Sequence, residues 1–92
     1  MPLTMLQRDF IWGEEKYIDF QITSRVMKAV VVTEADFTLF KDFQIVQQGK
    51  CEIDGAYLSA LIKPPDVGEY LLEVRYTVPP ETRKVKVVVY VR

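Results

Sequence analysis

The residues that could do chemistry in this chain are mostly carboxylates, because histidine is absent and cysteine occurs once. Without histidine the chain lacks the most frequent general base, a common zinc ligand and every histidine-dependent catalytic triad. A single cysteine cannot complete a structural zinc site either. Any catalytic or metal chemistry would therefore have to come from the acidic residues.

Those acids fall where solvated carboxylates are usual. Glu14, Glu15, Asp54 and Asp66 all lie at expected turns, and none has the Asp-x-Asp spacing of a calcium loop. The glycines are isolated from one another, so no dinucleotide-binding or phosphate-loop pattern occurs. We expect no catalytic residue, no cofactor and no metal, and hence a protein that is not an enzyme.

Cys51 is expected to be a small buried apolar residue. The alternative, a reactive thiol, needs a neighbouring group that lowers its pKa, and no histidine is there to do so. A lone cysteine also excludes an internal disulfide, which suggests a reducing compartment or indifference to redox state.

Charge and hydropathy indicate neither nucleic acid nor a membrane as a partner. Twelve basic and thirteen acidic residues leave a net charge of -1, so no basic field attracts an anionic polymer or surface. The first residues lack a cationic segment followed by an apolar run, and the longest apolar run, residues 87–91, is too short to span a bilayer. We expect a cytoplasmic or virion-associated protein.

Alternating apolar residues predict strands through most of the chain. We expect strands over residues 5–12, 16–23, 35–40, 43–46, 70–78 and 85–91, with a turn at residues 41–42. Gly49 is expected to mark a bulge or a change of sheet. Residues 24–35 combine a valine run with residues that tolerate a helical turn; a strand or an irregular extended segment is favoured.

Asp54-Gly55 is the clearest turn signal and suits a type I′ hairpin. Such a turn sets Ile53 opposite Ala56 and Cys51 opposite Leu58. The residues expected to point inward are then all apolar: Cys51, Ile53, Ala56, Leu58, Ala60 and Ile62.

The last two expected strands flank Pro79-Pro80, which cannot donate ladder hydrogen bonds and so belongs to a loop. Two registers keep their apolar faces together. One sets Glu73 opposite Lys86, and the other sets Arg75 opposite Lys86. Opposite charges across a strand pair contribute roughly 0.2–1 kcal/mol, which favours the first.

These elements predict one domain over residues 1–92, an all-β Greek-key sandwich of about seven antiparallel strands. No helix is expected that could cover one face of a single sheet, and the turns are short. A small closed barrel is the structural alternative.

The stretch from Asp66 to Leu72 points to a more specific fold class. Gly68 permits a tight entry into a strand, and Tyr70 would point into the core with a hydroxyl that bonds a backbone group a few residues upstream, the tyrosine corner. The pattern Asp66-x-Gly68-x-Tyr70-x-Leu72 resembles the Asp-x-Gly-x-Tyr-x-Cys signature of immunoglobulin-like domains, with leucine in place of the cysteine.

The wider pattern, from Gly49-x-Cys51 to the valine-rich end, resembles small immunoglobulin-like modules of bacteriophage and prophage tails, which form baseplate, fibre or tube-decorating parts. The resemblance implies a non-enzymatic structural or protein-interaction module and carries over no catalytic residue. One departure is Trp12, which lies on the first strand although antibody-type domains keep their core tryptophan on the third.

Two surfaces could bind a partner. The favoured register gathers Leu71, Val88 and Tyr90 on the outer face of the last two strands, where they could contact a protein partner or a second copy. A basic strip beside them could instead touch an acidic partner or simply be solvated; it comprises Arg75, Arg83, Lys84 and Lys86.

The alternative function is a carbohydrate- or other ligand-binding module. Its stacking platforms would be Trp12, Tyr17 and Tyr57. Trp12 itself is expected to be buried at the end of the first strand rather than to anchor a contact.

Overall fold

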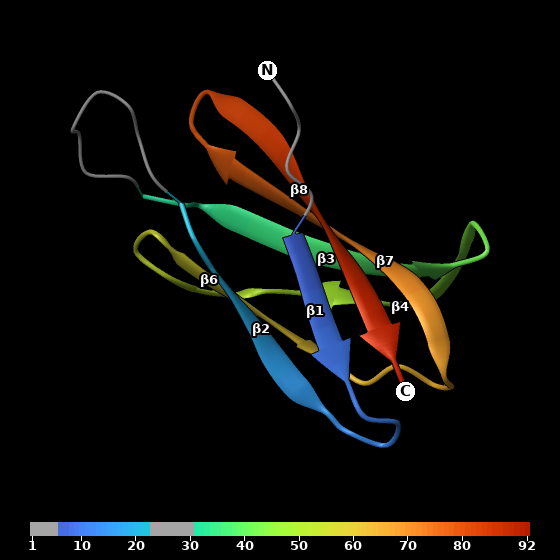
Figure 1. Ribbon diagram of the computed structural model, residues 1–92. Coiled ribbons are helices and arrows are strands. Elements are labelled where there is room, and N and C mark those ends of the chain that lie inside the picture. The colour runs from blue at the N-terminus through green and yellow to red at the C-terminus, as the bar shows by residue number, and fades with distance from the viewer. Residues whose placement is uncertain (1–5, 23–30) are drawn as a thin grey trace.

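The computed structural model describes residues 6–22 and 31–92, which form eight strands and no helix (Figure 1). The alternation of apolar and polar residues accounts for this, because it gives each strand one face to bury. The strands are β1 (Leu6–Phe10), β2 (Lys16–Gln21), β3 (Glu34–Lys41), β4 (Gln44–Lys50), β5 (Glu52–Asp54), β6 (Tyr57–Ile62), β7 (Gly68–Val78) and β8 (Glu81–Val91).

The strands form two sheets, as expected for a β-sandwich. The larger sheet has five strands in the order β1-β8-β7-β3-β4, and the smaller has three in the order β2-β6-β5. Two expectations need correction. There are eight described strands rather than seven, and β1 pairs with β8 in parallel, so the strands are not all antiparallel.

The inward side chains of both sheets meet in one core. Leu39, Leu72 and Val87 from the larger sheet and Leu58 and Ile62 from the smaller are fully buried. Burying each such side chain contributes roughly 1.5–3 kcal/mol, so the core is the main source of stability.

The β7–β8 hairpin has the register that the sequence favours. Glu73 lies opposite Lys86, and the turn closes with Val78 opposite Glu81. Pro79 and Pro80 occupy the turn and are joined by a cis peptide bond. The same register sets Arg75 opposite Lys84, and Glu73 forms its ion pair with Lys84 at 3.4 Å, so charge across the strands accounts for this pairing only in part.

The β5–β6 hairpin differs from the expected one. Asp54 pairs with Tyr57 and Ile53 with Leu58, so the central turn residues are Gly55 and Ala56. Gly55 has a φ of 59°, while Ala56 is not among the residues with positive φ, as in a type II′ turn with glycine first. Ile53, expected inside, is 38% exposed on the short edge strand.

The β3–β4 turn is also displaced by one residue. It was expected at Lys41 and Asp42, but Lys41 pairs with Gln44, so the central residues are Asp42 and Phe43. Both have positive φ, 51° and 64°. Phe43 is therefore a turn residue and does not begin the strand.

The region around Gly49 changes sheet, one of the two expected possibilities. β4 ends at Lys50 in the larger sheet, and β5 begins at Glu52 in the smaller. The bulge lies elsewhere, because the β3–β4 register shifts between Leu39 and Phe40.

Of the segment 24–35, residues 24–30 lie outside the described residues, so the expected strand there is not described. Residues 31–33 lie outside the strands, Val32 is buried, and β3 begins at Glu34.

The side chain of Gln47 links the two sheets beside this crossing. Its amide nitrogen donates to the carbonyl oxygen of Leu61 at 3.4 Å, and its amide oxygen accepts from the backbone N–H of Lys63 at 3.0 Å. β5 is too short to pair with this end of β6, so the Gln47 side chain hydrogen-bonds backbone groups on the edge that β5 does not reach.

Candidate interaction surface on the five-stranded sheet

The corner that leads into β7 is built from Asp66, Gly68 and Tyr70. The Tyr70 hydroxyl donates to the Asp66 carbonyl oxygen at 2.8 Å and accepts from the Asp66 backbone N–H at 3.1 Å. Tyr70 is 2% exposed, so its hydroxyl has a backbone partner at the edge of the core. That partner lies upstream, where the sequence predicted one.

Gly68 makes the corner possible. Its φ of 133° is rarely adopted by residues with side chains, and an added Cβ would lie 3.3 Å from the Lys41 side chain. The Lys41 ammonium donates to the Val67 carbonyl oxygen at 3.0 Å and lies 5.3 Å from the centre of the Tyr70 ring. The corner therefore ties the start of β7 to the end of β3.

The outer face of the larger sheet carries an apolar row across four strands. Val88 pairs with Leu71, Leu71 with Phe40, and Phe40 with Ile45. Residues directly opposite each other share a face, so these side chains lie side by side. We name Ile45, Phe40, Leu71 and Val88, together with the adjacent Tyr90, the outer stripe.

Most of the outer stripe is half-buried, and Ile45 is 58% exposed. Isolated apolar residues on a surface are ordinary, whereas a contiguous row makes this face a candidate contact surface. The sequence predicted Leu71, Val88 and Tyr90 for this surface but missed Phe40 and Ile45. Alternation already placed Phe40 on the face opposite Phe37, so a signal existed for it.

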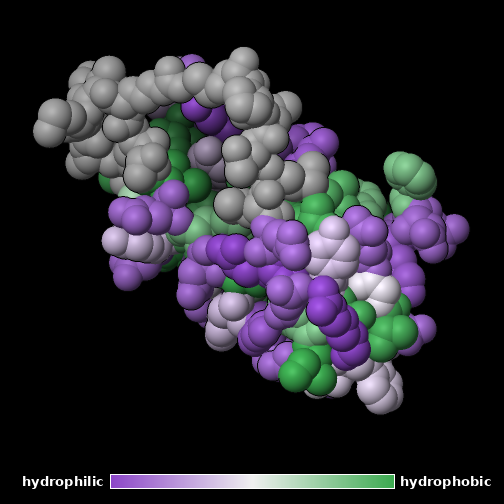
Figure 2. Space-filling model, viewed as in Figure 1, coloured by the Kyte–Doolittle hydropathy of each residue, from purple (hydrophilic) through white to green (hydrophobic). Residues whose placement is uncertain are grey.

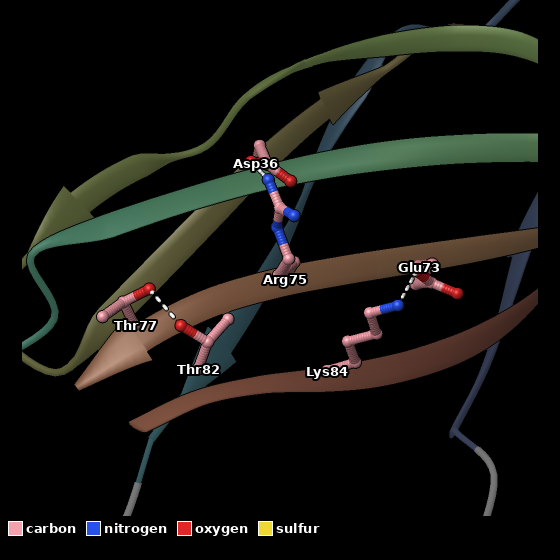
Figure 3. Close-up of polar contacts among 6 residues, drawn as sticks. All are labelled: Asp36, Glu73, Arg75, Thr77, Thr82 and Lys84. Carbon is pink, nitrogen blue, oxygen red and sulfur yellow. Dashed lines mark hydrogen bonds and ion pairs between the residues drawn. The ribbon is translucent and has the colours of Figure 1, made fainter. Parts of the chain in front are cut away.

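Polar residues cover the same face beside the outer stripe (Figure 3). Arg75 contacts Asp36 at 3.0 Å, Lys84 contacts Glu73 at 3.4 Å, and the hydroxyls of Thr77 and Thr82 lie 3.0 Å apart. Each contact joins neighbouring strands of the sheet. All these groups are partly exposed, so the contacts contribute little to stability. They make this part of the face polar.

An open hollow of about 500 Å³ lies among these residues. Asp36, Glu73, Arg75 and Lys84 line it, and their side chains already pair with one another. The hollow therefore presents balanced charges to solvent.

The expected basic strip does not form a continuous positive patch. Arg83 contacts Glu81 at 2.6 Å, and this hydrogen bond together with the charge of Glu81 raises the pKa of Arg83. Arg75 and Lys84 also have acidic partners, and Lys86 lies opposite Glu73. Four residues that form a cluster in the sequence are thus largely neutralised in the fold.

Cys51 is buried, as the sequence predicted. Burial and the nearby charge of Asp36 raise the pKa of its thiol to about 11. A thiol with so high a pKa is a poor nucleophile near neutral pH. Within residues 6–22 and 31–92, no three acidic or cysteine side chains gather as a metal site would require.

The aromatic residues of the ligand-binding alternative are exposed but spread apart. Trp12 is 60% exposed, so the expectation that it is buried is wrong; its ring N–H donates to the Pro65 carbonyl oxygen at 3.4 Å. Tyr17 and Tyr57 share the outer face of the smaller sheet. They pair with Leu61 and Gln21 respectively, which separates them by about 13 Å along the strands.

Helices capable of crossing a membrane are absent from the part of the chain described here. Comparison with protein families, with curated proteins and with solved structures gave no match. The fold and surface described above define an all-β protein of two sheets.

Proposed function

We propose that this chain is a non-enzymatic, immunoglobulin-like structural module that binds a protein through the outer stripe. The observation that carries the proposal is the contiguous apolar row from Val88 to Ile45, which crosses four strands on a solvent-facing surface. A row of this kind, flanked by polar groups, has the composition of a protein interface with an apolar centre and a polar rim.

The strand order supports the immunoglobulin-like class. In such a module β8, β7, β3 and β4 would correspond to strands G, F, C and C′, and β2, β6 and β5 to strands B, E and D. The hydrogen bonds of Tyr70 at the start of β7 add the corner expected there.

The sequence resemblance suggests a setting for this module, the tail of a bacteriophage or prophage, where small sandwich domains join larger parts. In that setting the partner would be another structural protein of the particle. Its surface would present apolar side chains to the outer stripe, with polar groups toward the balanced charges beside it.

The proposal is tested with Leu71→Lys against the products of neighbouring genes. Leu71 lies at the centre of the outer stripe, so a buried ammonium there should weaken binding at least tenfold. Titration calorimetry with the wild-type chain and each candidate protein measures the change.

Leu61→Lys is the matched control, because Leu61 is a half-buried leucine on the outer face of the smaller sheet. It should leave binding unchanged. Equal loss in both variants, or no binding to any neighbouring product, would count against the proposal.

A further inference from the structure

The tip of the β3–β4 hairpin carries an aromatic side chain that the fold does not need. Phe43 is 102% exposed and has a φ of 64°. Two-residue turns with positive φ favour Asn-Gly or Asp-Gly, and a bulky residue there is a conformational outlier. Neither burial nor turn geometry favours phenylalanine here, so its exposure points to a binding role.

The surroundings of Phe43 strengthen this assignment. Ile45 and Val46 follow it with exposed fractions of 58% and 38%. In Figure 2 an apolar projection stands out where the β3–β4 hairpin ends in Figure 1. The register shift in β4 interrupts its backbone ladder, which disfavours pairing of this edge with another strand. A partner would therefore contact this edge through side chains.

An open pocket of about 330 Å³ lies toward the other end of β3. Its lining is mixed: Phe20, Ile22, Tyr76 and Val85 are apolar or aromatic, whereas Arg8, Asp19 and Gln21 are polar. Tyr76 pairs with Ala35 near the start of β3, whereas Phe43 follows its end. The eight residues of β3 separate the two by about 25 Å.

We propose that a second copy of this chain binds head-to-tail, with Phe43 of one copy seated in this pocket of the next. An apolar cavity of about 150 Å³ holds a benzene molecule, so this pocket can take a phenyl ring. We call Phe43 the knob and the pocket the hole. Because they lie at opposite ends of one molecule, repeated binding generates an open chain or a ring rather than a closed dimer.

Charge complementarity supports the same occupant. Asp42 adjoins the knob and forms no ion pair within the described residues. Arg8 lines the pocket, and its guanidinium contacts only the Gln7 carbonyl oxygen in the described part of the chain. Seating Phe43 would bring Asp42 toward Arg8, two charges that form no ion pair within the described residues. Asp19 also lines the pocket, and its carboxylate accepts a hydrogen bond from the Ser59 hydroxyl at 2.6 Å.

Phe43 and the pocket lie outside the outer stripe, although Ile45 of the stripe lies close to Phe43 in the chain, so either proposal can fail without the other. Sedimentation velocity across a concentration series tests self-association. The wild-type chain should form species larger than a dimer, and Phe43→Ala should weaken association at least tenfold. Ile11→Ala removes another exposed apolar side chain, 70% exposed, and should leave association unchanged.

Complementation identifies the head-to-tail geometry. Val85→Trp fills the pocket, and Arg8→Asp, on the exposed part of β1, reverses its charge without entering the core. Each variant alone should be monomeric. An equimolar mixture of Phe43→Ala with either pocket variant should form dimers that do not grow, because only one knob and one hole remain.

Three results would overturn this inference. They are a wild-type chain that stays monomeric, a Phe43→Ala variant that assembles normally, and a mixture that forms no dimers. If the wild-type chain is monomeric and Phe43→Ala abolishes its binding to a different protein, then Phe43 binds that protein rather than a second copy. The outer-stripe proposal would stay intact.

A stability measurement separates binding from folding at this position. Phe43→Asn should raise the melting temperature, because asparagine tolerates positive φ, and should abolish assembly. Loss of assembly together with a lowered melting temperature would indicate that Phe43 serves the fold and would contradict the inference.

Discussion

The hydroxyl of Tyr70 is the residue-scale contact with the clearest energetic consequence. It both donates to and accepts from the backbone of Asp66. Tyr70→Phe should therefore lower the free energy of unfolding by about 1–3 kcal/mol, since a partly buried backbone carbonyl and N–H lose their partner. Urea denaturation of the two proteins measures the difference.

Tyr90→Phe supplies the control. Tyr90 is a half-buried residue of the outer face, and its hydroxyl has no hydrogen bond within the described residues. Its stability should change by less than about 0.5 kcal/mol. An unchanged midpoint for Tyr70→Phe would contradict a structural role for the corner.

The exposure of the Trp12 side chain could not be predicted from its residue type alone. The sequence suggested burial because large aromatic residues usually bury most of their surface. β1 ends at Phe10, however, and Phe10 takes the inward position beside Val91. Trp12 follows two residues later, beyond the strand, where alternation no longer determines which way a side chain points.

At the scale of elements, Gln47 joins β4 to β6. Gln47→Ala should lower stability by about 0.5–1.5 kcal/mol, because the Leu61 carbonyl and the Lys63 N–H both lose this partner. Hydrogen exchange should report faster exchange at Lys63, with thermal melting recording the overall loss.

Gln48→Ala is the matched comparison, since Gln48 is exposed on the other face of the same strand. It should have almost no effect. If both substitutions cost the same, the link between the sheets contributes nothing beyond the intrinsic preference of the strand.

Most of the strands, and the β7–β8 register, followed from the sequence because alternation and cross-strand charge act locally. Turn positions were less secure. Gly55 alone has positive φ in its turn, and Asp42 and Phe43 both adopt it in theirs. Whether a bulky residue accepts such a conformation depends on contacts that the local pattern does not contain.

The candidate surface was predicted in part for a similar reason. Leu71 and Val88 belong to one hairpin, so their pairing could be deduced from the turn between them. Phe40 and Ile45 join the outer stripe only because β3 pairs with β7. That pairing connects segments far apart in the chain, and no local signal fixed its register.

At the scale of the whole molecule, the buried thiol of Cys51 links stability to pH. Its pKa is raised from 9.0 to about 11. Between these values the unfolded chain has released the thiol proton and the folded chain has retained it, so the free energy of unfolding falls as pH rises. The loss from this group is at most roughly 3 kcal/mol.

Cys51→Ala isolates this contribution from those of the other ionisable groups. The variant should lose stability less steeply from pH 9 to about 11 than the wild-type chain does. Urea midpoints at several pH values give both slopes. Parallel slopes would mean that the thiol ionises equally readily in both states.

The parallel pairing of β1 with β8 determines how the molecule responds to mechanical load. Because the two strands run in the same direction, pulling Leu6 and Arg92 apart slides β1 along β8. The ladder hydrogen bonds then resist together, whereas an antiparallel hairpin opened from its end loses them one at a time. β7 pairs with the other edge of β8, so β8 is hydrogen-bonded along both edges when it is under tension.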